Sequence, residues 1–402
     1  MKDMSVAEKP KPQIPVLTSL RFFAAAAIVC FHGLGFLIAN PNSSLALGVS
    51  FFFVLSGFIL TYANDNAGRA VGRFYLGRVA RIWPIHVVTL LASVPILQIN
   101  QVDPAMFMAN LLLVHAWYPS GASVFSFNGV AWSLSIEAVF YLMFPLLVRI
   151  KRIELVFVGS LALALLGIAF VSQYPLVMPA ANPYAPNWLN FVLQNPITRL
   201  PEFLIGMIAA RRFAQRPMML STGAATCVEV ASLAFLAIFI MSSPLNFNWY
   251  PARTPQALSQ WIQQCGGLFN FALLIFVLAS SSGYVSRLLS WKPLVLLGEI
   301  SFCTYMVHLL ILRFAARQYT MSAFSVTAAV IVIYLSSYIL WRFVERPCRK
   351  AIVSIRQNKC QSAFNFDPRS ASNFDPLEPP VRAVALAPSE LAGVAGAMQE
   401  FR

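Results

Sequence analysis

The sequence predicts an all-α protein: a polytopic membrane helix bundle of about ten transmembrane helices, with one further re-entrant or interfacial helix. Composition is the first reason, because 58% of the 402 residues are hydrophobic and only 11% are charged. An average soluble domain is much less apolar. The second reason is that apolar runs recur along most of the chain, many of them near the 20 residues that a helix needs to cross roughly 30 Å of hydrocarbon.

The predicted spans follow one another along the chain, at residues 16–38, 46–63, 82–99, 129–149, 153–172, 199–211, 220–242, 264–282, 294–314 and 322–343. No convincing small-residue cleavage pattern follows the first run, so we expect a retained helix and not a signal peptide. The run at 104–118 is apolar but short for a span. We expect it to be re-entrant or interfacial.

The distribution of basic residues predicts the orientation of the chain. Lys and Arg collect in cytoplasmic loops, and a cytoplasmic N-terminus places 24 of the 29 Lys and Arg residues inside and four outside, with Arg21 within the first span. This count requires that 104–118 does not cross. We therefore expect both termini to be cytoplasmic, and the chain to divide into an N-terminal segment at 1–15, a transmembrane domain at 16–350 and a polar tail at 351–402.

Two predicted outer loops, 173–198 and 243–263, carry aromatic residues: Tyr184, Trp188, Trp249, Tyr250 and Trp261. Such rings form an aromatic belt at the membrane interface more often than they stack on sugars. The tail is polar and Pro-rich, and we expect it to be disordered.

Composition also excludes several ligands and partners. The net charge is +14, but the basic residues occupy short loops and tails instead of one basic face, which argues against a nucleic-acid partner. The six cysteines are scattered and lack ligand spacing, so we expect neither a disulfide framework nor a metal site. No permanently bound cofactor and no oligomeric state are indicated.

Four ionisable side chains fall inside predicted spans: Arg21, His32, Glu137 and His308. Each costs about 2.5 kcal/mol or more in the bilayer, so each is a functional candidate. Arg21 and His32 are eleven residues apart, a net helical rotation of about 20° and a rise of about 16 Å. They share one helix face, which links the cytoplasmic rim to the outer half of the membrane.

His32, Glu137 and His308 lie about 9 to 12 Å below the outer ends of their predicted spans. A histidine beside a carboxylate in a dry site forms a base with a group that orients it. The alternative is that each polar group satisfies a neighbouring helix, but matched depths favour a functional site. Arg78 and Arg81 precede the third span and have the spacing to hold phosphate, although orientation alone would also place arginine there.

Several short motifs occur in order along the chain. They are Arg21 and His32 with ten residues between them, SFFFVLSGFILTY at 50–62, Arg78 and Arg81 before IWP, WSLSIEAVFYLMFP at 132–145, ISFCTYMVH at 300–308 and FVERP at 343–347. Together they resemble the acyltransferase family 3 of membrane proteins, over roughly residues 15–350. The resemblance implies a ten-span enzyme of the bacterial inner membrane. Such an enzyme moves an acyl group, acetyl by default, from cytoplasmic acyl-coenzyme A to a hydroxyl, commonly of a surface or exported polysaccharide.

The resemblance also implies roles for individual residues. His32 matches the catalytic base, and Glu137 matches an acid that orients or assists it. Arg78 and Arg81 match the pair that holds the nucleotide phosphates of the donor, whose thioester arm would pass Arg21. Supporting residues of less settled role are His308, Ser133 and Tyr141.

The sequence departs from the family pattern at Ala138, where many members carry a second acid, so a mechanism with two adjacent carboxylates is not expected. Only a polar tail follows the last span, and we expect no attached extracellular domain. Direct transfer and transfer through acylated His32 use the same residues. The alternative function is a polysaccharide or small-molecule transporter or flippase with His and Glu as a proton relay, but the chain lacks the internal symmetry typical of transporters.

Overall fold

The computed structural model describes residues 11–38, 43–64, 71–174, 187–215, 218–249 and 256–352. Within these residues every regular element is helical, and eight stretches are long and apolar enough to cross a membrane. The described chain is therefore an all-α polytopic membrane bundle, as the composition predicts. The tail beyond residue 352 lies outside the described residues.

The helical elements in chain order are α1 (Pro15–Leu34), η1 (Ser43–Leu47), α2 (Gly48–Ala63), α3 (Val71–Ile96), α4 (Pro104–Leu111), α5 (Gly121–Val124), α6 (Trp132–Leu147), α7 (Ile153–Val171), α8 (Trp188–Gln194), α9 (Pro196–Gln215), α10 (Thr222–Trp249), α11 (Gln256–Cys265), α12 (Leu268–Ser280), α13 (Tyr284–Leu289), α14 (Lys292–Gln318), α15 (Ala323–Leu340) and the π-helical turn η2 (Trp341–Glu345).

Eight of the predicted spans coincide with the eight long apolar stretches. The other two, 129–149 and 199–211, correspond to α6, an apolar helix of 16 residues, and to α9, which has 20 residues. The prediction for the start of the third span is wrong, because α3 begins at Val71 and not near residue 82. The charged residues in the first turns of α3 lower the hydropathy there, which explains the wrong prediction. Arg78 and Arg81 lie on this helix and not in a loop.

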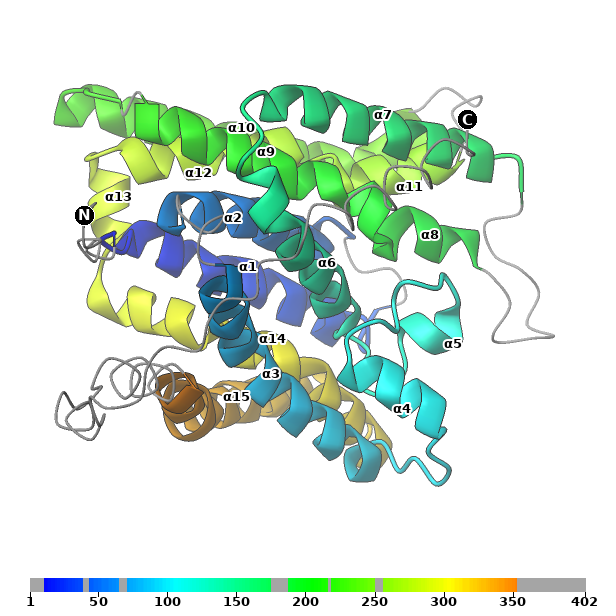
Figure 1. The fold of residues 1–402 in the computed structure, drawn as a ribbon. Coiled ribbons are helices and arrows are strands. Elements are labelled where there is room, and N and C mark those ends of the chain that lie inside the picture. The colour runs from blue at the N-terminus through cyan, green and yellow to red at the C-terminus, as the bar shows by residue number, and fades with distance from the viewer. Residues whose placement is uncertain are drawn as a thin grey trace, which may run out of the picture. The chain divides into compact units, whose positions relative to one another are not determined.

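The central helices α1 and α2 lie between two groups of helices (Figure 1). On one side α1 packs against α14, which packs against α15, and on the other α2 packs against α9, which contacts α7 and α12. Glycines allow the closest approaches, as is common between membrane helices. A Cβ atom at Gly298 would lie 1.9 Å from the Thr18 carbonyl oxygen, and one at Gly57 would lie 2.0 Å from that of Phe203.

The segment predicted to be re-entrant or interfacial does not form a spanning helix. Its helix α4 has eight residues, about 12 Å, and the chain then folds around the start of α6. Ser135 Oγ donates to the Leu113 carbonyl at 2.7 Å, and Asn128 Nδ2 donates to the Met306 carbonyl of α14 at 2.9 Å. Helix α6 therefore begins inside the protein and not at its surface.

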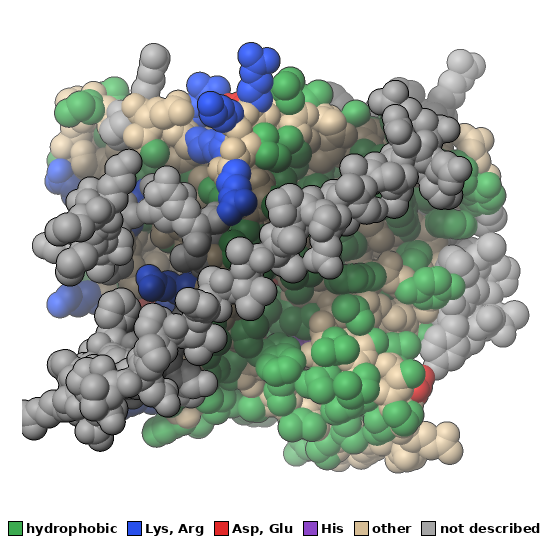
Figure 2. Space-filling view, in the orientation of Figure 1, with side chains coloured by type: hydrophobic (Ala, Val, Ile, Leu, Met, Phe, Trp, Pro, Cys, Tyr) green, Lys and Arg blue, Asp and Glu red, His purple; other side chains and the backbone are tan. Residues whose placement is uncertain are grey.

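Basic side chains gather at one end of the bundle. Arg212 of α9 pairs with Glu154 of α7 at 3.3 Å, and Arg287 of α13 donates to Thr222 of α10 at 3.3 Å. We call the end marked by Arg152, Arg211, Arg212 and Arg287 the basic end. On the face shown in Figure 2, Lys and Arg side chains lie mainly toward the left, where α1 begins in Figure 1, and hydrophobic side chains cover much of the remaining described surface.

Candidate active site

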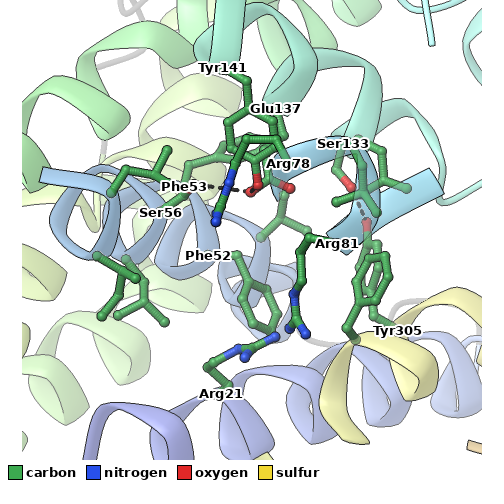
Figure 3. A pocket seen from close by; sticks show the side chains of 17 residues that line it. Arg21, Phe52, Phe53, Ser56, Arg78, Arg81, Ser133, Glu137, Tyr141 and Tyr305 are labelled. Carbon is green, nitrogen blue, oxygen red and sulfur yellow. Dashed lines mark hydrogen bonds between the residues drawn. The ribbon is translucent and has the colours of Figure 1, made fainter. Parts of the chain in front are cut away.

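Two cavities lie along α1, and the structure separates the predicted site residues between them. The first, the arginine cavity, has a volume of about 160 Å³ and is lined by Arg21, Arg78, Arg81, Ser133, Glu137 and Tyr141 among others (Figure 3). The second, the histidine cavity, has a volume of about 370 Å³ and is lined by His32, Gln194, Arg199, Gln264 and Arg313 among others. Val49 and Tyr305 line both cavities. Arg21 and His32 thus serve neighbouring cavities from one helix, as their spacing predicts.

The arginine cavity carries an excess of positive charge. Arg81 forms an ion pair with Glu345 of η2, which the FVERP motif supplies. Among the described residues, no carboxylate lies within ion-pair distance of Arg21 or Arg78. The Arg78 guanidinium instead lies over the rings of Phe74 and Tyr141, at 5.8 and 5.7 Å from their centroids, and its buried Nε has no hydrogen-bond partner there. Cations that lack a partner in a largely apolar cavity favour an anionic ligand.

Glu137 belongs to the arginine cavity. Its Oε1 accepts hydrogen bonds from Ser56 Oγ at 3.0 Å and from Tyr141 Oη at 2.5 Å. The expectation that Glu137 orients His32 is therefore wrong. Its depth was counted from residue 129 as if that residue lay at the membrane surface, but the chain before α6 is folded into the protein, so Glu137 lies closer to the arginines.

His308 takes the place beside His32 that Glu137 was expected to fill. Its Nε2 lies 3.1 Å from His32 Nδ1, and its Nδ1 lies 2.7 Å from the Tyr305 carbonyl oxygen. His32 Nδ1 is also 3.0 Å from the Ile28 carbonyl oxygen. Carbonyl oxygens only accept hydrogen bonds, so with both rings neutral each Nδ1 carries the hydrogen. His32 Nδ1 then donates to His308 Nε2, and the lone pair of His32 Nε2 remains free for the cavity.

Tyr305 lines both cavities, and Ser133 of the arginine cavity bonds to it. Tyr305 Oη donates to the Val130 carbonyl at 3.0 Å and lies 2.8 Å from Ser133 Oγ. The bond between the two side chains is drawn in Figure 3. Ser133 therefore acts on the boundary between the cavities through Tyr305, whereas Tyr141 contacts Glu137. The two supporting residues of α6 thus have separate contacts.

Sequence reasoning missed a buried ion pair at the histidine cavity. Arg199 is one of the four basic residues that the orientation prediction places outside, with Arg253, Arg313 and Arg317. It is 1% exposed, and its Nε lies 2.9 Å from Oε2 of Glu202, which is fully buried. The guanidinium also lies 5.1 Å from the ring centroid of Phe53 and 5.9 Å from that of Trp132. The available signal was the spacing of opposite charges three residues apart at the start of α9.

The aromatic residues of the outer loops divide into two groups. Trp261 is buried in α11, where its Nε1 donates to the Thr198 carbonyl at 3.1 Å, so it is a packing residue and not a free sugar platform. Trp188 is half-buried, with its ring centroid 5.6 Å from that of Tyr174. Tyr184, Tyr250 and the side chain of Trp249 lie outside what the structure describes.

Comparisons with known proteins identify a family and several relatives. A family model described as an acyltransferase domain matches residues 14–342. Acyltransferase MdmB of Streptomyces mycarofaciens is 30% identical over 379 residues, which cover 85% of this chain and 92% of that protein. O-acetyltransferase OatA of Staphylococcus aureus (strain MRSA252) is 28% identical over 395 residues, which cover 90% of this chain and 60% of OatA. No solved structure gives a significant match.

Proposed function

Because this chain belongs to the acyltransferase family that the matching domain defines, we propose that it transfers an acyl group from acyl-coenzyme A to a hydroxyl of a surface or exported polysaccharide or a related glycan. The family and the relatives make the chain a multi-pass membrane O-acyltransferase. The donor, the acceptor and the bacterial inner membrane as location are our proposal. Acetyl is the proposed group, since OatA is named an O-acetyltransferase.

One observation carries this proposal: a cavity with an excess of arginine charge adjoins a cavity that holds a histidine with a free ring nitrogen. The sequence predicts Arg78 and Arg81 as the phosphate-binding pair, but Arg81 is paired with Glu345, so we assign the donor phosphates to Arg78 and Arg21, because guanidinium groups bind phosphate through charge-assisted hydrogen bonds. The arginine cavity is much smaller than coenzyme A, so it accommodates a phosphate group and the start of the thioester arm, while the adenosine stays nearer the basic end and the acyl end points toward the histidine cavity. This arrangement supports donor entry from the cytoplasm, as the orientation prediction requires.

In the proposed reaction the acceptor hydroxyl enters the histidine cavity from the outer side. His32 Nε2 removes the hydroxyl proton as the oxygen attacks the thioester carbonyl, a contribution of about 10² to 10⁴ in rate for a general base. The C–O bond of the ester forms, the C–S bond breaks, and the thiolate of coenzyme A receives the proton from His32. His308 orients the His32 ring through their hydrogen bond, and Glu137 lines the arginine cavity. If His32 is acylated first, the same nitrogen is the nucleophile.

The test is acyl transfer by membranes that contain the wild-type chain or His32→Ala. Membranes are incubated with radiolabelled acetyl-coenzyme A, and label is counted in the glycan fraction. Wild-type membranes should label the glycan, and the variant should lose this labelling while its amount in the membrane is unchanged. Normal labelling by His32→Ala would contradict the proposed role of His32, and movement of unmodified glycan without labelling would favour a transporter.

A further inference from the structure

Tyr305 and Val49 form the boundary between the arginine cavity and the histidine cavity, since of all the lining residues these two are common to both. Val49 is 8% exposed and Tyr305 is 7% exposed, so both are packed within the protein. A group that moves from one cavity to the other has to pass these two side chains. The size of these two side chains therefore limits the size of the group that can pass between the cavities.

The Tyr305 ring is held in place by hydrogen bonds at its hydroxyl and by two neighbouring rings. Its hydroxyl bonds to the Val130 carbonyl and to Ser133, and its centroid lies 6.2 Å from that of Phe52 and 5.8 Å from that of His308. Rotation of the ring out of the boundary would remove both hydrogen bonds of the buried Tyr305 hydroxyl, which costs about 1 to 3 kcal/mol for a group left without a partner. The boundary is thus a fixed constriction and not a loose side chain.

We propose that Tyr305 and Val49 select the acyl group by size, so that only a short acyl chain on the thioester arm reaches His32 Nε2. This inference rests on the proposed function, in which the donor occupies the arginine cavity and the base lies in the histidine cavity. Neither side chain makes or breaks a bond in the reaction. Both act as specificity-determining residues, through the volume that they leave free beside the path of the acyl group.

The experiment compares three donors in membranes that contain the full chain: acetyl-, butyryl- and octanoyl-coenzyme A, each labelled in the acyl group. Wild type should transfer acetyl best. Tyr305→Ala should raise the ratio of butyryl to acetyl transfer at least tenfold, and Val49→Ala should raise it less, because it removes fewer atoms. Tyr305→Phe keeps the ring and should keep the wild-type ratio even if its rate falls.

Tyr338→Ala is the matched control, because Tyr338 lies on α15 outside both cavities and is 45% exposed. It should retain the wild-type ratio. An unchanged ratio in Val49→Ala and in Tyr305→Ala would overturn the inference, and Val49→Ala decides alone if Tyr305→Ala does not accumulate. A wild type that transfers octanoyl as well as acetyl would also overturn it. Absence of any acyl ester with wild type would instead contradict the proposed function, and the size selection with it.

Discussion

The hydrogen bonds of His32 assign a different task to each of its ring nitrogens. Nδ1 is occupied by the Ile28 carbonyl and by His308 Nε2, at 3.0 and 3.1 Å, which leaves Nε2 to meet a substrate. A second imidazole therefore fixes the tautomer and the ring plane, a task that a carboxylate performs in many hydrolases. Because a neutral ring adds no negative charge, its contribution is mainly one of orientation.

Substitution of His308 should therefore lower turnover without weakening donor binding. We expect His308→Ala to reduce kcat by less than the roughly 10²- to 10⁴-fold that a general base contributes. The KM for acyl-coenzyme A should stay unchanged, because His308 does not line the arginine cavity. Steady-state kinetics on the purified chain measure both constants. His86→Ala is the control, since His86 is another buried histidine outside both cavities. A wild-type kcat for His308→Ala would show that His32 needs no such partner.

Substitution of Arg78 should instead weaken donor binding and leave turnover nearly unchanged. Loss of a charge-assisted hydrogen bond costs about 1.5 to 3 kcal/mol, so Arg78→Gln should raise the KM for the donor roughly 10- to 100-fold and change kcat much less. Arg73→Gln is the matched control, because Arg73 is an exposed arginine of the same helix that does not line the cavity. Equal donor KM values for the two variants would argue against phosphate binding at Arg78.

The sequence was informative about residues that share a helix and much less so about residues on different helices. Arg21 and His32 could be placed on one face because helical geometry fixes their rotation and rise. Depths on separate helices can be compared only if the end of each span is known, and the depth of Glu137 was counted from the wrong starting point, which is why Glu137 was expected beside His32. Arg199 was misplaced for a related reason, since its spacing from Glu202 signals a local ion pair but nothing near it in the sequence shows that α11 lies against it.

At the scale of the helices, two contacts between α1 and α14 position the histidine pair. Gly298 of α14 lies against the Thr18 carbonyl near the start of α1, and His308 meets His32 near its end. The two helices therefore run parallel. The glycine contact sets how closely they approach, and the distance between the two imidazole rings depends on this approach.

Gly298→Ala should disturb both stability and activity, because the new Cβ atom would lie 1.9 Å from a backbone oxygen that cannot move alone. Overpacking of this kind costs about 1 to 3 kcal/mol. Thermal unfolding of the purified chain should show a lower midpoint, and kcat should fall as α1 moves away from α14. Gly159→Ala on α7, where a Cβ would meet nothing within 4 Å, should change neither. A wild-type unfolding midpoint and kcat for Gly298→Ala would refute this account of the contact.

Hydropathy predicted most of the spanning elements, because length and apolarity are local properties of the chain. Hydropathy failed where contacts between distant residues determine whether a segment is helical or crosses the membrane. The first turns of α3 are helical although they carry arginines, since Phe74 and Ala80 on the same turns are buried. The chain between α4 and α6 is apolar but not a span, because it folds around α6 and bonds to α14.

At the scale of the whole membrane domain, basic side chains mark one end of the described helices, and this end is predicted to face the cytoplasm. Fusion to a reporter enzyme that is active only outside the cytoplasm tests this orientation. The reporter should be active when fused after Gln318, at the end of α14, and inactive when fused after Ile352. The reverse pattern would invert the protein in the membrane and contradict the proposed entry of the donor from the cytoplasm.

The pairing of His32 with His308 joins positions that are 276 residues apart. During synthesis the first of these histidines enters the membrane with the earliest hydrophobic segment, but its partner leaves the ribosome only after α14 has been translated. A nascent chain therefore lacks the histidine that orients His32 until most of the membrane helices are inserted. If acyl-coenzyme A is the donor, as proposed, prematurely terminated chains that lack α14 should not consume it, because the partner that orients His32 is missing.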